Sequence, residues 1–194
     1  MYVVGMGLDP SKINKFRNYL IFIRIKESVC KMAKKIFVEY LYLDLNTCDR
    51  CIGTDVVLEE VLDAITPTLN LAGYDVELAK IEITSVDLAE QYKFLSSPTI
   101  RVNGIDISTT VEENSCGCCS EISNSEVDCR VFEYNGETYE IAPKEMIASL
   151  ILEKIFGTFS QDCNCTEYEL PENLKAFFKG KEGKSKCSCH GGCC

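Results

Sequence analysis

The alternation of apolar and polar residues predicts a strand, a helix and a second strand in the first half of the chain. Residues 36–45 form a nearly continuous apolar run, which is typical of a central, buried strand. Apolar residues then recur at helical spacing over residues 57–65, and Thr54 is the expected N-cap of this helix. Pro67 is expected to kink or end the helix. Residues 76–84 alternate apolar and charged side chains, as in a half-buried strand.

The second half predicts two hairpins and a final helix. Asn-Gly pairs at residues 103–104 and 135–136 are typical of tight turns between short antiparallel strands. A polar, cysteine-containing insertion over residues 108–128 separates the two hairpins. The helix predicted over residues 143–157 begins at a proline and ends at a glycine. Residues 32–157 therefore predict one α/β domain of packed layers, which carries this insertion.

The two ends of the chain differ from this domain in composition. Residues 1–31 are basic and carry little periodicity, and the change at Met32 favours Met32 as the natural start; a genuine surface helix is the alternative. Residues 158–194 form a polar, cysteine-rich tail. Within the tail, residues 171–179 predict a short helix that docks on the domain through its apolar side chains, namely Leu174, Phe177 and Phe178.

Charge argues against two classes of partner. The chain has 30 acidic and 20 basic residues, and residues 36–194 alone carry a net charge of −16. An acidic body repels phosphate backbones, so we do not expect nucleic acid as a partner. Arg24 and Lys26 interrupt the best candidate for a membrane-spanning run, so no membrane partner is expected either.

The cysteines predict thiol chemistry more than structural disulfides. There are 13 of them, an odd number, and they cluster as Cys-x-x-Cys, Cys-x-Cys-Cys and Cys-x-Cys. The first 31 residues do not resemble a signal peptide, because they lack a cleavage site and a long apolar run. We therefore expect a reducing, cytoplasmic location, where clustered cysteines bind metal or exchange disulfides.

The first cysteine group, Cys48-Asp49-Arg50-Cys51, follows the first predicted strand. Cys48 would lie at a helix N-terminus, where free N–H groups and Arg50 favour a thiolate while Asp49 opposes it. Cys51 has the spacing to close a disulfide with Cys48 or to resolve a mixed disulfide. The group therefore predicts a redox-active dithiol.

Together with Ser97-Pro98-Thr99 before the third strand, this motif resembles the thioredoxin superfamily over residues 36–157. The resemblance implies a three-layer α/β/α fold in which Cys48 attacks and Cys51 resolves. It also implies that Pro98 follows a cis peptide bond and faces the two cysteines, and that the backbone beside it, at Ser97 and Thr99, holds the substrate as an added strand. The cysteine-rich insertion and the tail resemble an uncharacterised prokaryotic thioredoxin-like family without an assigned activity. The chain departs from ordinary thioredoxins in having no tryptophan and an Asp-Arg dipeptide between the cysteines.

The other cysteines predict either a metal site or a relay. Three thiols of the insertion, together with Cys129 just after it, could hold zinc, another soft cation or a metalloid, or could form a disulfide that passes electrons to Cys48; the three are Cys116, Cys118 and Cys119. An inert loop is the third interpretation. The tail adds Cys163 and Cys165, and its end carries a ligand-like group or a disulfide shuttle consisting of Cys187, Cys189, His190, Cys193 and Cys194.

Two functions remain open from the sequence. The first is thiol–disulfide exchange with a protein or small-molecule thiol or disulfide, which requires no cofactor. The second is binding or trafficking of a soft ion such as zinc, copper, mercury or arsenite, without turnover. A single histidine cannot build a Ser-His-Asp or Cys-His catalytic core, and no glycine-rich phosphate loop follows a strand.

Overall fold

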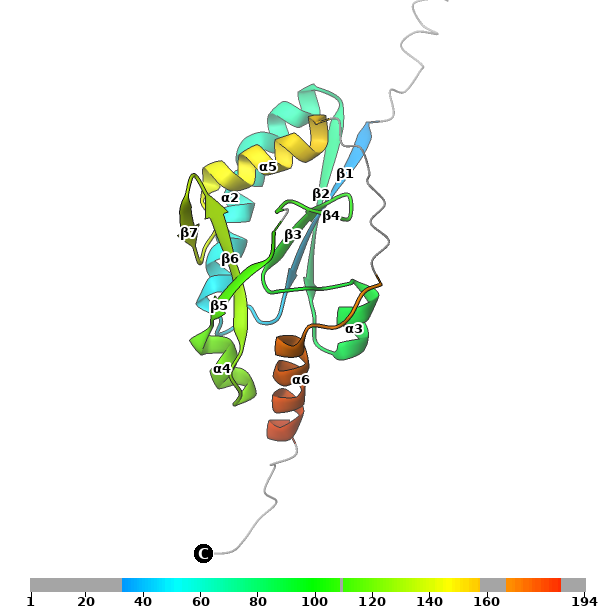
Figure 1. The fold of residues 1–194 in the computed structure, drawn as a ribbon. Coiled ribbons are helices and arrows are strands. Elements are labelled where there is room, and N and C mark those ends of the chain that lie inside the picture. The colour runs from blue at the N-terminus through cyan, green and yellow to red at the C-terminus, as the bar shows by residue number, and fades with distance from the viewer. Residues whose placement is uncertain (1–32, 109, 158–166, 186–194) are drawn as a thin grey trace, which may run out of the picture. The chain divides into compact units, whose positions relative to one another are not determined.

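The computed structural model describes residues 33–108, 110–157 and 167–185 (Figure 1). Their helices and strands, in chain order, are β1 (Lys34–Tyr42), α2 (Asp49–Leu71), β2 (Tyr74–Glu82), α3 (Val86–Gln91), β3 (Thr99–Val102), β4 (Ile105–Asp106), β5 (Glu112–Ser115), α4 (Gly117–Ser123), β6 (Asp128–Tyr134), β7 (Glu137–Tyr139), α5 (Lys144–Phe156) and α6 (Glu172–Ser185). Across these ranges, no helix combines the length and the apolar character needed to cross a lipid bilayer.

The main sheet has the order β2-β1-β3-β4, with β1 parallel to β2 and antiparallel to β3. Helices α2 and α5 cover one face, where they pack on Ile36, Val38 and Tyr40 of β1. Helices α3 and α6 belong to the apolar cluster on the other side, which includes Leu41 of β1. The predicted α/β fold with three layers is confirmed, and the continuous apolar run belongs to the central strand β1.

Helix α2 differs from the prediction at both ends. It begins at Asp49 with Cys48 as its N-cap, and Thr54 lies buried inside the helix, so the prediction of Thr54 as the cap is wrong. An acidic residue in the first turn stabilises the earlier start, because it complements the helix dipole. The helix also continues past Pro67 to Leu71. Burial of Leu69 beyond the proline offsets the backbone hydrogen bond that Pro67 cannot donate.

Both predicted Asn-Gly turns are confirmed. Asn103 and Gly104 have φ values of 52° and 79°, and Asn135 and Gly136 have φ values of 54° and 82°. A two-residue turn with positive φ at both positions matches the twist of the strands that it joins. The first turn joins β3 to β4, and the second joins β6 to β7.

The cysteine-containing insertion folds into regular structure. Strand β5 pairs with β6, and β6 pairs with β7, which makes a second, three-stranded antiparallel sheet. Helix α4 connects β5 to β6. The insertion and the second predicted hairpin therefore form one unit, which carries Cys116, Cys119 and Cys129.

Helix α6 packs against α4 and begins and ends later than the predicted helix of residues 171–179. Its apolar residues Leu174, Phe177 and Phe178 are buried in the same cluster as Cys48 and Cys119. The two helices are in close contact at Gly180, where a methyl group would overlap the carbonyl oxygen of Ser123. A glycine is therefore required at this contact.

This contact gives a prediction with a matched control. We expect Gly180→Ala to lower the free energy of unfolding by about 1–3 kcal/mol, because α6 must move away from α4. Gly183 lies one turn further on, in open space, and Gly183→Ala should raise stability by up to about 1 kcal/mol through helix propensity. Urea denaturation followed by circular dichroism measures both effects. Equal stability of the two variants would contradict the proposed contact.

Candidate functional site

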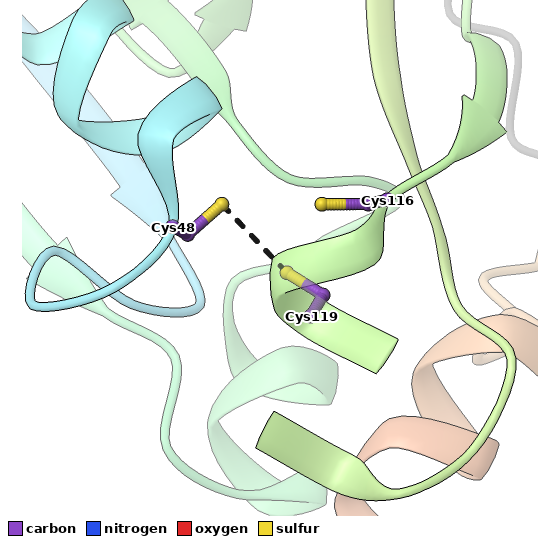
Figure 2. Close-up of side chains that lie close together, drawn as sticks. All are labelled: Cys48, Cys116 and Cys119. Atoms are coloured by element: carbon purple, nitrogen blue, oxygen red, sulfur yellow. Dashed lines mark hydrogen bonds between the residues drawn. The ribbon is translucent and has the colours of Figure 1, made fainter. Parts of the chain in front are cut away.

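Five thiols converge beyond the end of β1. Cys48 and Cys51 lie at the start of α2, Cys116 and Cys119 at the start of α4, and Cys129 in β6. All five are buried, with at most 4% of each residue exposed. Figure 2 shows the side chains of Cys48, Cys116 and Cys119 directed toward one another from the two helix starts.

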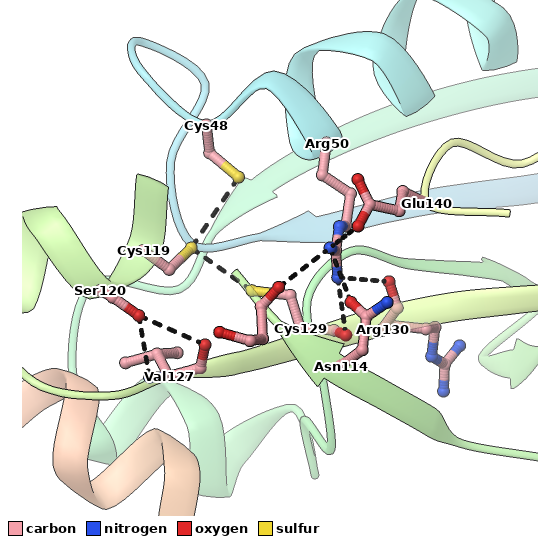
Figure 3. Close-up of polar contacts among 10 residues, drawn as sticks. Cys48, Arg50, Asn114, Cys119, Ser120, Val127, Cys129, Arg130 and Glu140 are labelled. Atoms are coloured by element: carbon pink, nitrogen blue, oxygen red, sulfur yellow. Dashed lines mark hydrogen bonds and ion pairs between the residues drawn. The ribbon is translucent and has the colours of Figure 1, made fainter. Parts of the chain in front are cut away.

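Cys119 lies between two of the other sulfur atoms. Its Sγ is 3.8 Å from the Sγ of Cys48 and 3.4 Å from the Sγ of Cys129 (Figure 3). The sulfur atoms of Cys48, Cys116 and Cys119 all lie within 4.8 Å of one another. These separations exceed the roughly 2.05 Å of a disulfide bond. All six cysteines of the described ranges are therefore free thiols.

Ser97, two residues before β3, contacts the first cysteine pair. Its Oγ lies 3.3 Å from the Sγ of Cys51 and accepts a hydrogen bond of 3.1 Å from the backbone N–H of Leu43. The Ser97–Pro98 peptide bond is cis, as the resemblance implies. Thr99 is buried, and its hydroxyl donates to the carbonyl oxygen of Ser96. Ser97 therefore faces the Cys-x-x-Cys motif directly.

The carbonyl of Ser97 is already bonded within the chain. It accepts a hydrogen bond of 2.7 Å from the backbone N–H of Arg130 in β6. The resemblance assigns this backbone to an added substrate strand. In this protein, strand β6 lies where the resemblance places the added substrate strand. Cys129 is the residue before Arg130, which donates this hydrogen bond.

Arg50 fixes the second sheet to the start of α2. Its guanidinium donates to the carbonyl oxygens of Cys129 and Arg130, at 2.8 and 3.2 Å, and to Oδ1 of Asn114 at 2.8 Å. It also forms an ion pair of 2.8 Å with Glu140. The guanidinium of Arg50 thus forms hydrogen bonds with β5 and β6 and an ion pair with Glu140 (Figure 3). The side chain is directed at these carbonyls and at Glu140, and the effect of its charge on Cys48 stays a prediction.

A second buried arginine makes the same connection from the other side. Arg130 is fully buried and forms an ion pair of 2.8 Å with Asp106 of β4. The two arginines, together with the hydrogen bond to Ser97, hold the second sheet against the main sheet.

The neighbouring thiols decide where a thiolate is favoured. A hydrogen bond to Cys116 and burial raise the pKa of Cys48, whereas hydrogen bonds from Cys119, Cys129 and Cys48 lower the pKa of Cys116. Hydrogen bonds from Cys48 and Ser97 lower the pKa of Cys51 against the effect of burial. In the reduced cluster, contact with Cys116 and burial thus oppose the thiolate that the helix terminus favours at Cys48.

The remaining predicted ligands separate into two sets. Cys118 is half-buried on α4, beside the enclosed cluster. The tail residues lie outside the described residues; they are Cys163, Cys165, Cys187, Cys189, His190, Cys193 and Cys194. Sequence reasoning missed the roles of Arg50 and Arg130. No local sequence pattern predicts that these two charges are buried. The one available signal is the position of Arg50 inside the Cys-x-x-Cys motif, which places it where α2 meets the second sheet.

The fold and the site define a cysteine-rich α/β protein with a buried thiol cluster. The model of the domain of unknown function DUF2703 matches residues 36–151, and the chain belongs to that family. The comparisons with curated proteins and with solved structures gave no match. Membership of the thioredoxin superfamily stays a prediction.

Proposed function

We propose that the protein performs thiol–disulfide exchange at Cys48 and Cys51, in a site of thioredoxin-like design. Exchange passes through a mixed disulfide, so a working site needs three sulfur atoms within reach of one another. Cys48 supplies this arrangement: Cys51 follows three residues later in the first turn of α2, and the Sγ of Cys48 is 3.8 Å from that of Cys119. This sulfur contact is the observation that carries the proposal.

The exchange follows from the positions of the two cysteines. Cys48 attacks one sulfur of a substrate disulfide, and the second substrate sulfur leaves as a thiol. Cys51 then attacks Cys48, the mixed disulfide breaks, and the substrate leaves as a dithiol. The hydrogen bonds that lower the pKa of Cys51 support it as the resolving thiolate. Two electrons and two protons pass from Cys48 and Cys51 to the substrate.

Burial restricts the substrates. Cys48 has no exposed surface and packs in one apolar cluster with side chains of α4, β6 and α6. An external disulfide reaches Cys48 only when this packing opens, so small disulfides and flexible segments are favoured over folded surfaces.

Single-turnover reduction of glutathione disulfide tests this proposal. We expect the reduced full-length protein to form a Cys48–Cys51 disulfide, which peptide mapping after alkylation identifies, and to release glutathione. Cys48→Ser should abolish this turnover at the motif, whereas Cys118→Ser, on the adjacent helix, should retain it. Turnover that forms the same amount of glutathione after Cys48→Ser would reject the proposal.

Binding of a soft ion is the second candidate function, and the three-sulfur group of Cys48, Cys116 and Cys119 favours it. Four thiolates around zinc, with Zn–S bonds of about 2.3 Å, hold their sulfurs about 3.8 Å apart. The Cys48–Cys119 separation matches this value, and Cys129 offers a fourth thiol. Buried thiolates select soft ions such as zinc, copper, mercury or arsenite.

Ion binding predicts a specific dependence on oxidation state. Reduced protein should bind one equivalent of zinc or arsenite under anaerobic conditions, and Cys119→Ser should remove most of this binding, because Cys119 belongs to the three-sulfur group. Oxidation of Cys48 with Cys51 should release the ion, since only thiolates bind. Competition with a chromophoric chelator measures zinc. Reduced wild-type protein that binds neither ion would reject this second function.

A further inference from the structure

The insertion carries a second Cys-x-x-Cys spacing that matches the first. Cys116 is the N-cap of α4 and Cys119 follows three residues later, as Cys48 and Cys51 do at α2. Both N-cap residues are extended, with φ and ψ of −116° and 105° at Cys116 and of −84° and 100° at Cys48. The carbonyl of each accepts a hydrogen bond from the residue four positions later, at 3.0 and 2.9 Å respectively. The two cysteine pairs have equivalent backbone settings.

The two pairs face each other through a direct sulfur contact. The Sγ atoms of Cys48 and Cys119 are 3.8 Å apart, although the residues are 71 positions apart in the sequence (Figures 2 and 3). Cys116 lies within 4.8 Å of both atoms. All of these sulfurs are buried, so a neighbouring thiol is a more accessible reaction partner than a solute.

The attachment of the insertion keeps this contact in place. Arg50 and the carbonyl of Ser97 both bind the backbone of β6, next to the first cysteine pair. The strand position beside Ser97 is thus filled by the chain itself. A protein with this arrangement presents an internal disulfide to Cys48 more readily than an external one.

We infer that Cys116 and Cys119 form a second redox pair, and that their disulfide is the immediate exchange partner of Cys48 and Cys51. This inference rests on the proposed exchange function and names its first substrate. In the first step, Cys48 attacks the Sγ of Cys119. The Cys48–Cys119 bond forms, the Cys116–Cys119 bond breaks, and Cys116 takes up the proton of Cys48.

Cys51 completes the transfer. It attacks the Sγ of Cys48, so that the Cys48–Cys51 bond forms and the Cys48–Cys119 bond breaks. Cys119 leaves as a thiolate and takes up the proton of Cys51. Cys48 and Cys51 lose two electrons and two protons, and Cys116 and Cys119 gain them. The transfer is reversible and requires no further reactant.

Trapping the mixed disulfide tests this inference in the full-length protein. The variant Cys51→Ser/Cys116→Ser lacks the two thiols that the proposed steps pair with Cys48 and with Cys119. After oxidation with diamide, alkylation and digestion, we expect mass spectrometry to find the Cys48 peptide linked to the Cys119 peptide. The matched control, Cys51→Ser/Cys118→Ser, keeps Cys116 and should accumulate several-fold less of this linked peptide.

Two results would overturn the inference. One is Cys48 linked to Cys129 or to a tail cysteine in place of Cys119. The other is a Cys48 thiol that stays free in the double variant while wild-type Cys48 and Cys51 still reduce glutathione disulfide. This second result separates failure of the inference from failure of the proposed function.

Wild-type protein provides the test if the double variant does not fold. A Cys116–Cys119 disulfide should be replaced by a Cys48–Cys51 disulfide at a rate that is independent of protein concentration. A rate proportional to concentration would contradict an internal transfer.

Discussion

Replacement of Arg50 by methionine is expected to lower the free energy of unfolding by about 3 kcal/mol. The guanidinium is 5% exposed and donates to the backbone carbonyls of the buried residues Cys129 and Arg130 and to the exposed Asn114, so its loss removes two buried, charge-assisted hydrogen bonds. Its ion-pair partner Glu140 is 64% exposed and regains water, which keeps the loss near the lower end of the range for buried pairs. Urea denaturation measures the change.

Two further variants sharpen this prediction. Arg50→Lys keeps the charge but not the planar donors, so it should recover only part of the stability. Lys175→Met removes an exposed ion pair with Glu172 and should change stability by less than about 1 kcal/mol. An Arg50→Met variant as stable as Lys175→Met would show that Arg50 does not hold the second sheet in place.

Phe177→Ala is expected to cost about 3–5 kcal/mol and to open the thiol cluster. The Phe177 ring is fully buried, belongs to the apolar cluster of the five thiols and stacks edge-on against Phe178. Its removal leaves a cavity under α4, so Cys48 and Cys119 should react faster with iodoacetamide. Denaturation and peptide-resolved alkylation measure the two effects.

Phe156→Ala is the matched control for this variant. Phe156 is 55% exposed at the end of α5, and its replacement should cost about 1 kcal/mol or less. Unchanged alkylation of Cys48 after Phe177→Ala would contradict the role of α6 in covering the cluster.

The main sheet could be predicted from the sequence where local pattern and burial agree. The apolar run of β1 buries Ile36, Val38, Tyr40 and Leu41, although Phe37 is 47% exposed. Two Asn-Gly pairs adopt the positive φ values that their turns require. Helix α2 shows where local rules compete. The helix begins at Asp49 and not after Thr54, because an acidic residue in the first turn stabilises the earlier start. It continues past Pro67, because Leu69 is buried.

The site could be predicted only as separate motifs. The spacing of Cys48 and Cys51 and the cis bond before Pro98 follow from short segments. The contact between Cys48 and Cys119 joins segments that are distant in the sequence. Buried arginines and the packing of α6 stabilise this contact, and no periodicity of the sequence predicts it. The thiolate position could not be read from the helix terminus, because the pKa of Cys48 depends first on Cys116.

An anaerobic redox titration of the full-length protein, read by thiol alkylation and peptide mapping, tests the exchange function most directly. The proposed function predicts a reversible two-electron couple at Cys48 and Cys51 with a potential between about −180 and −270 mV, the range from disulfide isomerase to thioredoxin. Cys48→Ser should eliminate this couple. Thiols at Cys48 and Cys51 that stay reduced across the range, or that form a disulfide only irreversibly, would contradict it.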